Sequence, residues 1–142
     1  MTDINDDGTP IKRSAELALE MADINKDEIT FVSAHGSSTP QNDLAENAAF
    51  HSLFGERLKN IPVTALKSQA GHALAAANSL EIASCVLSIV NRKIAPTINL
   101  DQLDPQCDLD IVQQARKIEG DINILKTSSG FSGIHSALII GQ

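Results

Sequence analysis

Two short segments of this chain place a histidine where it could handle protons. His35 follows an apolar run and begins the segment HGSSTP (35–40), whereas His72 ends the segment KSQAGH (67–72). A histidine at the end of a strand, beside a flexible backbone, is well placed for acid–base work. A neutral imidazole also donates a hydrogen bond, which can stabilise a carbonyl oxygen or a developing oxyanion. Both histidines are therefore candidate catalytic residues.

Each of these features also has a plainer interpretation. A histidine at the end of a strand often stabilises a turn or caps a helix. The hydroxyls of Ser37 and Thr39 would more often cap the helix that begins near Asn42. His51 lies in the middle of a predicted helix with no site around it, so we interpret it as a surface or packing residue.

A charged pair is expected to support the histidines. Glu81 carries a carboxylate on an otherwise apolar helix, and a charge in that setting usually has a partner of opposite sign. Lys67 is the candidate partner. Such an ion pair can be purely structural, yet it would still orient the side chains beside it.

Apolar periodicity predicts the elements that position these residues. We expect helices over 9–23, 43–54 and 72–90, strands over 29–34, 62–65, 122–127 and 136–140, and irregular chain over 91–105. Thr9 and Pro10 mark the start of the first helix, because Thr can cap and Pro suits the first helical position. Alternating helices and strands predict an α/β layered fold. One domain over 9–142 is expected after an N-terminal tail of residues 1–8.

The helix predicted over 72–90 is small or apolar on nearly every side. Such a helix is normally buried all round, although a chain of this size cannot easily surround it. Something else should cover part of it. Interleaved polar residues make it too polar for a membrane span. His72 would sit at its N-terminus, where the helix dipole disfavours imidazolium and keeps the ring neutral.

Composition excludes several classes of function. The formal charge is −7 and no cluster of Lys and Arg appears, which argues against a nucleic-acid partner. Two cysteines do not make a disulfide framework, and the acidic N-terminus predicts no signal peptide, so a cytoplasmic location is expected. His35, His72 and Asp43 have no compact ligand spacing, so no metal site is predicted.

Jointly, the segments resemble the β-ketoacyl-[acyl carrier protein] synthases of the bacterial chain-elongating type, in the thiolase-like superfamily. Segment 35–46 is similar to their His-Gly-Thr-Ser-Thr-Pro-x-x-Asp-x-x-Glu run, and segment 67–72 to their Lys-Ser-x-x-Gly-His run. The runs PTIN (96–99), DPQCDLD (104–110) and GFSG (130–133) have similar counterparts. The resemblance extends from about residue 8 to residue 141 in one order, so it is far more specific than any single motif.

The resemblance implies a decarboxylative Claisen condensation in fatty acid or polyketide synthesis. The substrates would be thioesters carried on the phosphopantetheine of acyl carrier protein, with no other cofactor. The implied fold has two similar α/β halves packed in five layers. This chain would be the C-terminal half, layered α-β-α with a mixed sheet, and its long buried helix would pack against a missing or partner half.

The resemblance also implies roles for individual residues. His35 and His72 would be the catalytic histidines, and Lys67 and Glu81 would support them. The backbone amide of Phe131 would form half of an oxyanion hole, and its side chain would gate the acyl pocket. Ser37 and Thr39 would bind the phosphopantetheine arm.

The chain departs from the family pattern at several points. The nucleophilic cysteine belongs to the family's N-terminal portion; Cys107 matches a non-catalytic cysteine, and Cys85 is expected to be an inert core thiol. Ser129 stands where Phe is usual, Ser132 where Gly is, and His135 where Asn is frequent. These changes bear on the gating loop and the acyl pocket.

Three hypotheses therefore remain open. The chain is the smaller subunit of a split synthase whose partner brings the cysteine, a non-catalytic subunit that stabilises or shapes a partner synthase as chain-length factors do, or a fragment. Retention of the histidines, with Lys67 and Glu81, favours the first. The expected partners are a cysteine-bearing N-terminal synthase half, as a separate chain that forms a hetero-oligomer or as a missing segment, and an acyl carrier protein. Because carrier proteins are acidic too, docking would need a basic patch, from Arg57 and Lys59 or from the partner.

Overall fold

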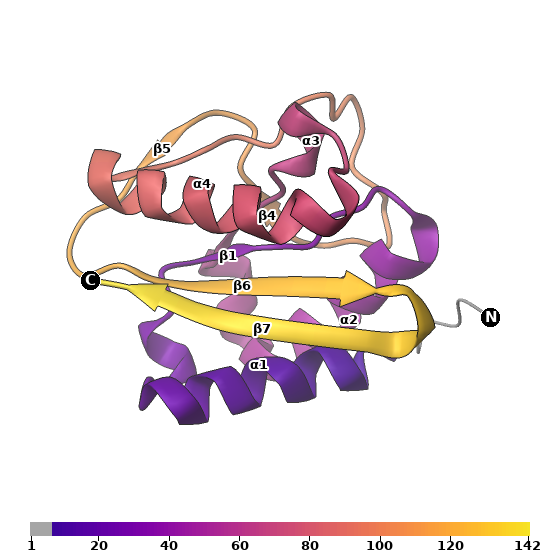
Figure 1. The fold of residues 1–142 in the computed structure, drawn as a ribbon, viewed down its shortest axis with the longest axis horizontal. Helices are drawn as coiled ribbons and strands as arrows, with labels where there is room; N and C mark the ends of the chain where they lie inside the picture. Colours follow the sequence, from indigo (N-terminus) through magenta and orange to yellow (C-terminus); the bar gives the residue numbers. More distant parts are fainter. Residues whose placement is uncertain (1–6) are drawn as a thin grey trace.

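Helices cover both faces of a five-stranded sheet in the computed structural model, which describes residues 7–142 (Figure 1). The helices are α1 (Thr9–Ala22), α2 (Pro40–Phe54), α3 (Lys67–Ala70) and α4 (Ala77–Asn91). The strands are β1 (Phe31–Ser33), β2 (Pro62–Thr64), β3 (Lys93–Ile94), β4 (Asp110–Ile111), β5 (Arg116–Lys117), β6 (Asn123–Gly130) and β7 (Ile134–Gly141). Single turns of 3₁₀ helix are η1 (Lys26–Glu28), η3 (Leu74–Ala76) and η4 (Phe131–Gly133), and η2 (Gly55–Asn60) is longer.

The main sheet is mixed, as expected, with the order β4-β2-β1-β6-β7. Strand β1 pairs in parallel with β2 and with β6, so that Val32 lies between Val63 and Leu125. Strand β4 continues the parallel part, and β7 closes the sheet antiparallel to β6. The carboxyl ends of β1, β2 and β6 therefore meet at one edge, which is where α/β sheets bind ligands.

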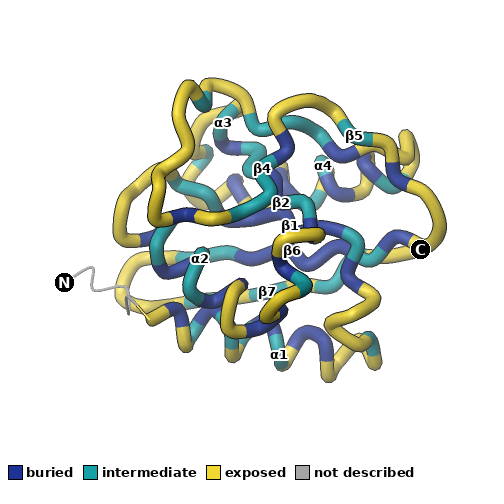
Figure 2. The backbone as a smooth tube through the Cα atoms, turned by 180° about the vertical axis from the view of Figure 1, so that it is seen from behind, coloured by how far each residue is buried: buried dark blue, intermediate teal, exposed yellow. Residues whose placement is uncertain are grey.

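Two apolar cores stabilise the layers, one on each face of the sheet. Helices α1 and α2 bury Leu19 and Phe50 against Val32 and Leu125. On the other face, α4 contributes Cys85 to a second cluster with Phe31, Ile94, Val112, Ile118, Ile122 and Ile124. The central strands are buried, whereas most loops are exposed (Figure 2). The α-β-α layering predicted from the sequence is confirmed.

Most predicted elements are confirmed, with shifted ends. Strands β1 and β2 are shorter than predicted, whereas β6 and β7 extend into the turn that separates them. Helix α2 begins at Pro40, three residues earlier than predicted, and Gly8 rather than Thr9 is the N-cap of α1. The segment expected to be irregular contains β3, which pairs with β5 in a small second sheet. The predicted tail falls mostly outside the described residues.

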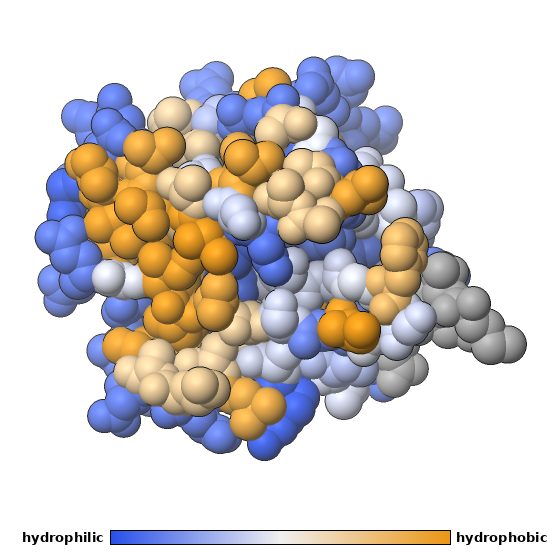
Figure 3. All heavy atoms as spheres, viewed as in Figure 1, coloured by the Kyte–Doolittle hydropathy of each residue, from blue (hydrophilic) through white to orange (hydrophobic). Residues whose placement is uncertain are grey.

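The predicted start of the long helix is wrong. Helix α4 begins at Ala77, because Gly71, with a φ of +73°, and the 3₁₀ turn η3 (Leu74–Ala76) take the place of a first helical turn. Within this chain α4 is buried on one face only, which agrees with the expectation that something else should cover part of it. Glu81 and Cys85 are 2% exposed, whereas Leu87 is 60% and Val90 72% exposed. Figure 3 shows apolar side chains gathered over α4 and the adjoining end of β7.

Segment Leu74–Asn91 is long and apolar enough to cross a membrane by length and composition, with a mean hydropathy of 1.4. Only 22% of it is buried in this chain. However, Glu81 lies at its centre and is ion-paired with lysines from two other parts of the chain. A charge at this depth is costly in lipid, so the contacts favour packing within a layered protein.

Candidate functional site

The candidate site lies at the carboxyl ends of the parallel strands. The chain leaves β1 through Ala34 to His35, and it leaves β2 through Leu66 to Lys67 and then to His72. Strand β6 ends at Gly130, next to Phe131. Segments that are distant in the sequence are thus brought to one edge by parallel pairing. The two histidine segments meet here, with the His35 and His72 ring centroids 5.6 Å apart.

A buried carboxylate fixes the backbone at His35. The amides of His35 and Gly36 donate to the two oxygens of Glu46, each over 2.8 Å. Thr127 and Asn42 donate to the same carboxylate, at 2.7 and 3.0 Å. Glu46 is 3% exposed, so four donors replace its water. Helix α2 and strand β6 together therefore hold the turn that carries the histidine.

Gly36 allows the two histidine segments to approach. Its φ is +49°, in the left-handed region that glycine adopts without strain. A Cβ atom at this position would lie 2.4 Å from the Cβ of Ala65, in the segment that follows β2. A side chain at position 36 would therefore push apart the turns after β1 and β2.

The side chain of His35 faces a buried cluster of charges. The Lys67 ammonium lies 3.2 Å from His35 Nδ1 and donates to the His35 carbonyl over 2.7 Å. Lys67 also forms an ion pair with Glu81 Oε1, which confirms the predicted pairing. The second carboxylate oxygen lies 2.7 Å from the ammonium of Lys126, on β6. All four side chains are at most 9% exposed.

These contacts set the charge and tautomer of His35. An ammonium can only donate, so Lys67 makes Nδ1 the acceptor and leaves the proton of the neutral ring on Nε2. Burial and the Lys67 charge lower the pKa of His35 from 6.5 to about 4, against the opposing charges of Glu46 and Glu81. His35 is therefore a neutral ring that presents an Nε2–H donor at physiological pH.

His72 also accepts a hydrogen bond at Nδ1, but from a backbone amide of its own loop. The predicted placement at a helix N-terminus is wrong, because His72 lies in the irregular segment before η3 and is exposed. The amide of Leu74 donates to His72 Nδ1 over 3.0 Å. Nδ1 is again the acceptor, so a neutral His72 also carries its proton on Nε2. The two rings are nearly perpendicular, with an interplanar angle of 78°.

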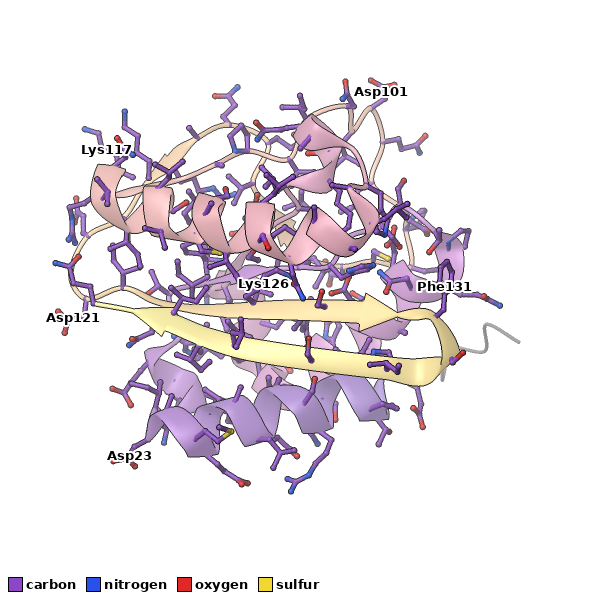
Figure 4. All side chains as sticks on the ribbon, viewed as in Figure 1. Asp23, Asp101, Lys117, Asp121, Lys126 and Phe131 are labelled. Atoms are coloured by element: carbon purple, nitrogen blue, oxygen red, sulfur yellow. The ribbon has the colours of Figure 1, made fainter. Side chains whose placement is uncertain are left out.

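The other predicted site residues lie at the rim of this edge. Ser37 Oγ and Thr39 Oγ1 are 2.9 Å apart and bond to each other, and Thr39 does not cap α2 with its hydroxyl. Phe131 is 77% exposed at the tip of the β6–β7 hairpin (Figure 4). These groups remain free to meet a ligand or another polypeptide.

The departures from the family pattern form a contact of their own. Ser129 and His135 are directly opposite in the β6–β7 ladder, and Ser129 Oγ lies 3.0 Å from His135 Nδ1. Burial lowers the pKa of His135. Ser132 adopts a left-handed φ of 65°, which is a strained choice for a residue other than glycine. The hairpin end is thus held by two side chains, Ser129 and His135, that stand where the family pattern has Phe and Asn.

The two thiols do not supply a nucleophile. Cys85 is 2% exposed in the core between α4 and the sheet, and Cys107 is 7% exposed in the loop before β4. Burial raises the pKa of both thiols, which suppresses the reactive thiolate. Within residues 7–142, no three His, Cys, Asp or Glu side chains are grouped as metal ligands.

Sequence reasoning missed Glu46 and Thr127 as the anchors of His35, and Lys126 as the second cation of the charged cluster. Glu46 was visible as a charged residue on the inner face of a predicted helix. Lys126 was visible as a charge within the apolar strand NILKT. A lysine in a central strand is an unusual choice, and it signals a buried anion nearby.

The two basic residues proposed for docking of a carrier protein already make other contacts. Arg57 donates to the backbone carbonyls of Lys26, Asp27 and Ile29. Its guanidinium therefore stabilises the segment that precedes β1. Lys59 forms an exposed ion pair with Glu56.

Comparison with known families gives a match over residues 1–101 to the family described as "Beta-ketoacyl synthase, C-terminal domain". A ketoacyl synthase alpha subunit of the tetracenomycin polyketide synthase of Streptomyces glaucescens is 39% identical over the whole chain. The 3-oxoacyl-[acyl-carrier-protein] synthase 2 of Synechocystis is 38% identical over 89% of the chain. The chain spans 33% and 30% of these relatives, about a third of their length.

Solved structures share the fold. A type II polyketide synthase acyl-carrier protein in complex with its ketosynthase matches with a TM-score of 0.93 and 44% identity, covering 98% of this chain and 34% of that one. The ishigamide ketosynthase/chain length factor matches with a TM-score of 0.89 and 36% identity, covering 96% of this chain and 33% of that one. The expected fold, part of a thiolase-like synthase, is confirmed.

Proposed function

Because the chain belongs to the β-ketoacyl synthase family, as its C-terminal domain, we propose that it supplies the two-histidine half of a synthase site. The reaction joins an acyl group, carried as a thioester on a cysteine outside this chain's own two thiols, to the malonyl group of malonyl-carrier protein. The bond from malonyl C2 to its carboxylate breaks, carbon dioxide leaves, and the electron pair enters the thioester as an enolate. The enolate carbon then bonds to the acyl carbonyl carbon, and the cysteine thiolate leaves.

The paired Nε2–H groups carry this proposal. Each Nδ1 atom accepts a hydrogen bond, from Lys67 at His35 and from the Leu74 amide at His72. Both rings then donate from Nε2, and donors aimed at one oxygen stabilise the negative charge that develops on the malonyl thioester. A ring pKa of about 4 keeps His35 from protonating at neutral pH.

The nucleophilic cysteine would come from another polypeptide or another segment. Both thiols of the chain are buried with raised pKa values, which makes them poor nucleophiles. The exposed apolar face of α4 supports the proposal that another half packs on this side. That face contains Leu80, Val86, Leu87 and Val90. A soluble domain rarely leaves such a patch uncovered.

Ser37 and Thr39 are proposed as ligands of the phosphopantetheine arm, and the Phe131 amide as a second oxyanion donor. Their position at the same edge as the histidines, with Thr39 and Phe131 exposed and Ser37 half-buried, supports both roles. Docking of acyl carrier protein would rely mainly on the partner half, since Arg57 is committed to backbone carbonyls.

A second candidate is a non-catalytic subunit of the chain-length-factor kind. Two of the similar structures are described as ketosynthases with chain length factors. The altered hairpin end, with Ser129 bonded to His135, also favours this alternative. The intact contacts of His35 with Lys67 and Glu46 favour the catalytic role, because a subunit without catalysis has no need to set a histidine tautomer.

The test begins with co-purification of the chain from its native cell, followed by mass and acyl-thioester analysis of any companion. A companion with an acylatable cysteine is expected. Condensation by the complex should disappear in His72→Ala with assembly intact, and should persist in His51→Ala, which removes a histidine on the outer helix α2. The chain alone should not condense. Near-normal condensation by the His72→Ala complex, or turnover by the chain alone, would contradict the proposal.

A second variant tests whether the companion binds the exposed apolar face of α4. Leu87→Asp places a charge on the exposed face of α4 and should release the companion while leaving the chain folded. Met21→Asp is the matched control, because Met21 is 89% exposed on α1 in the outer layer. Equal retention of the companion by both variants would show that α4 is not the covered face.

A further inference from the structure

The charged cluster contains a buried lysine that the proposed chemistry does not use. Lys126 is 1% exposed in the central strand β6 and lies between that strand and α4 (Figure 4). Its ammonium is 2.7 Å from Glu81 Oε2 and donates to the carbonyl of Thr127. Burying an ammonium is costly, so a lysine at this position needs a compensating interaction.

Glu81 is shared between two cations. Lys67 contacts one carboxylate oxygen and Lys126 contacts the other. The three side chains together carry one surplus positive charge when all are ionised. Glu46 is the other buried carboxylate near His35, and it is occupied by backbone amides, Thr127 and Asn42. The surplus charge therefore acts on His35 and on whatever anion forms beside it.

We propose that Lys126 is a second positioning residue of the synthase site. It holds the far oxygen of Glu81, so that Glu81 fixes Lys67 without neutralising it fully, and Lys67 continues to donate to His35 Nδ1. Lys126 thereby maintains the neutral, Nε2-protonated form of His35 and adds positive potential for the developing enolate. This role rests on the proposed function, but its structural part is measurable without catalysis.

The electrostatic environment of His35 supports the proposed role of Lys126. The groups that act on His35 are Lys67, Glu46, Glu81 and Lys126, and the two lysines lower the pKa of the ring. Lys126 lies on β6, Glu81 lies on α4, and Lys67 follows the carboxyl end of β2. The charged cluster therefore links three separate elements. Loss of Lys126 would leave Glu81 free to draw Lys67 away from the ring.

The first test is a histidine NMR titration of the full chain. Lys126→Met removes the charge at similar volume, and Lys12→Met is the control, since Lys12 is a surface residue of α1 paired with Glu16. The pKa of His35 should rise in Lys126→Met and not in the control, with loss of the single Nε2–H tautomer. An unchanged His35 pKa and tautomer in folded Lys126→Met would overturn the proposal.

A variant that fails to fold does not end the test. Lys126→Gln keeps a donor for Glu81 but lacks the charge, and it should raise the His35 pKa in the same direction. Lys126→Arg keeps the charge and should restore the wild-type titration more closely than Gln does. If both variants fold and titrate like the wild type, Lys126 is a structural residue only.

The second test uses the assembled enzyme. Lys126→Met should lower kcat about tenfold, a smaller loss than the hundredfold or more expected when His35 itself is replaced. The acidic limb of the pH profile should move to higher pH, because protonated His35 is inactive. A structural defect would lower yield without moving that limb. If the wild-type complex does not condense, the proposed function fails, while the NMR result for Lys126 still stands.

Discussion

His35 and His72 present the same ring nitrogen, but the chain supports them very differently. His35 is 6% exposed and its turn is fixed by Glu46, while its ring is fixed by Lys67. His72 is exposed and is held by one local bond from the amide of Leu74. One histidine is therefore determined by the interior of this chain, and the other is set only by its own loop.

The comparison indicates which parts of the site the chain completes alone. Around His35 the backbone amide, the carbonyl and the ring all meet buried side chains from other elements, so folding of the domain fixes this geometry. Around His72 the neighbouring apolar residues, such as Leu74 at 71% exposure, face outward. The His72 side of the site is therefore expected to become rigid only when another surface covers it. Four variants can break or sharpen this contrast.

The largest effect is expected at Glu46. Glu46→Ala removes the acceptor of the Gly36 amide and leaves the His35 amide only its longer contact with Thr127 Oγ1, and removal of one partner from such a network costs about 3–5 kcal/mol. Urea unfolding of the chain should show this loss. Glu16→Ala, on the surface of α1, should change stability by less than about 0.5 kcal/mol. Equal effects of the two variants would show that the His35 turn is not fixed by Glu46.

The second effect is a pH dependence that belongs to His35. The unfolded ring protonates near pH 6.5, whereas the folded ring protonates near pH 4, so the unfolded state binds more protons between these values. Stability should therefore fall as pH decreases from about 6.5 to about 4, by up to about 3 kcal/mol from this residue. His35→Asn should lose this component in pH-dependent unfolding. Identical pH profiles for wild type and His35→Asn would contradict the buried, neutral ring.

The same contrast explains what could be predicted from the sequence. The helices, the paired strands and the meeting of His35 with His72 follow from local patterns together with the rule that parallel strands share an edge. The contacts of Glu46 and Lys126 do not follow, because they join α2, α4 and β6 across the layers. No local pattern specifies which buried charge pairs with which.

Helix α4 shows what composition can predict and what it cannot. Its nearly all-round apolar surface predicts that this chain cannot cover the whole helix, and only the face that contains Glu81 and Cys85 is buried. The start of the helix is misplaced, since Gly71 and the turn η3 precede it within an apolar run that has no visible break in its pattern.

A smaller effect is expected at the hairpin end. Ser129→Ala removes the hydrogen bond to His135 Nδ1 and should cost about 1 kcal/mol. Ser136→Ala is the matched control, because Ser136 is an exposed serine of the same hairpin that lies next to His135. Urea unfolding of the two variants tests whether the polar pair stabilises this hairpin. Equal stabilities would assign the contact no structural role.

The smallest effect is expected at His72 itself. His72 is exposed and bonds only within its own loop, so His72→Ala should change the unfolding free energy of the chain by less than about 0.5 kcal/mol. The same substitution should abolish condensation in the complex, which separates function from stability at this position. A loss of stability comparable to that of Glu46→Ala would show that the His72 loop is fixed within this chain. The contrast between the two histidines would then be a difference in exposure alone, because both would be held by the fold.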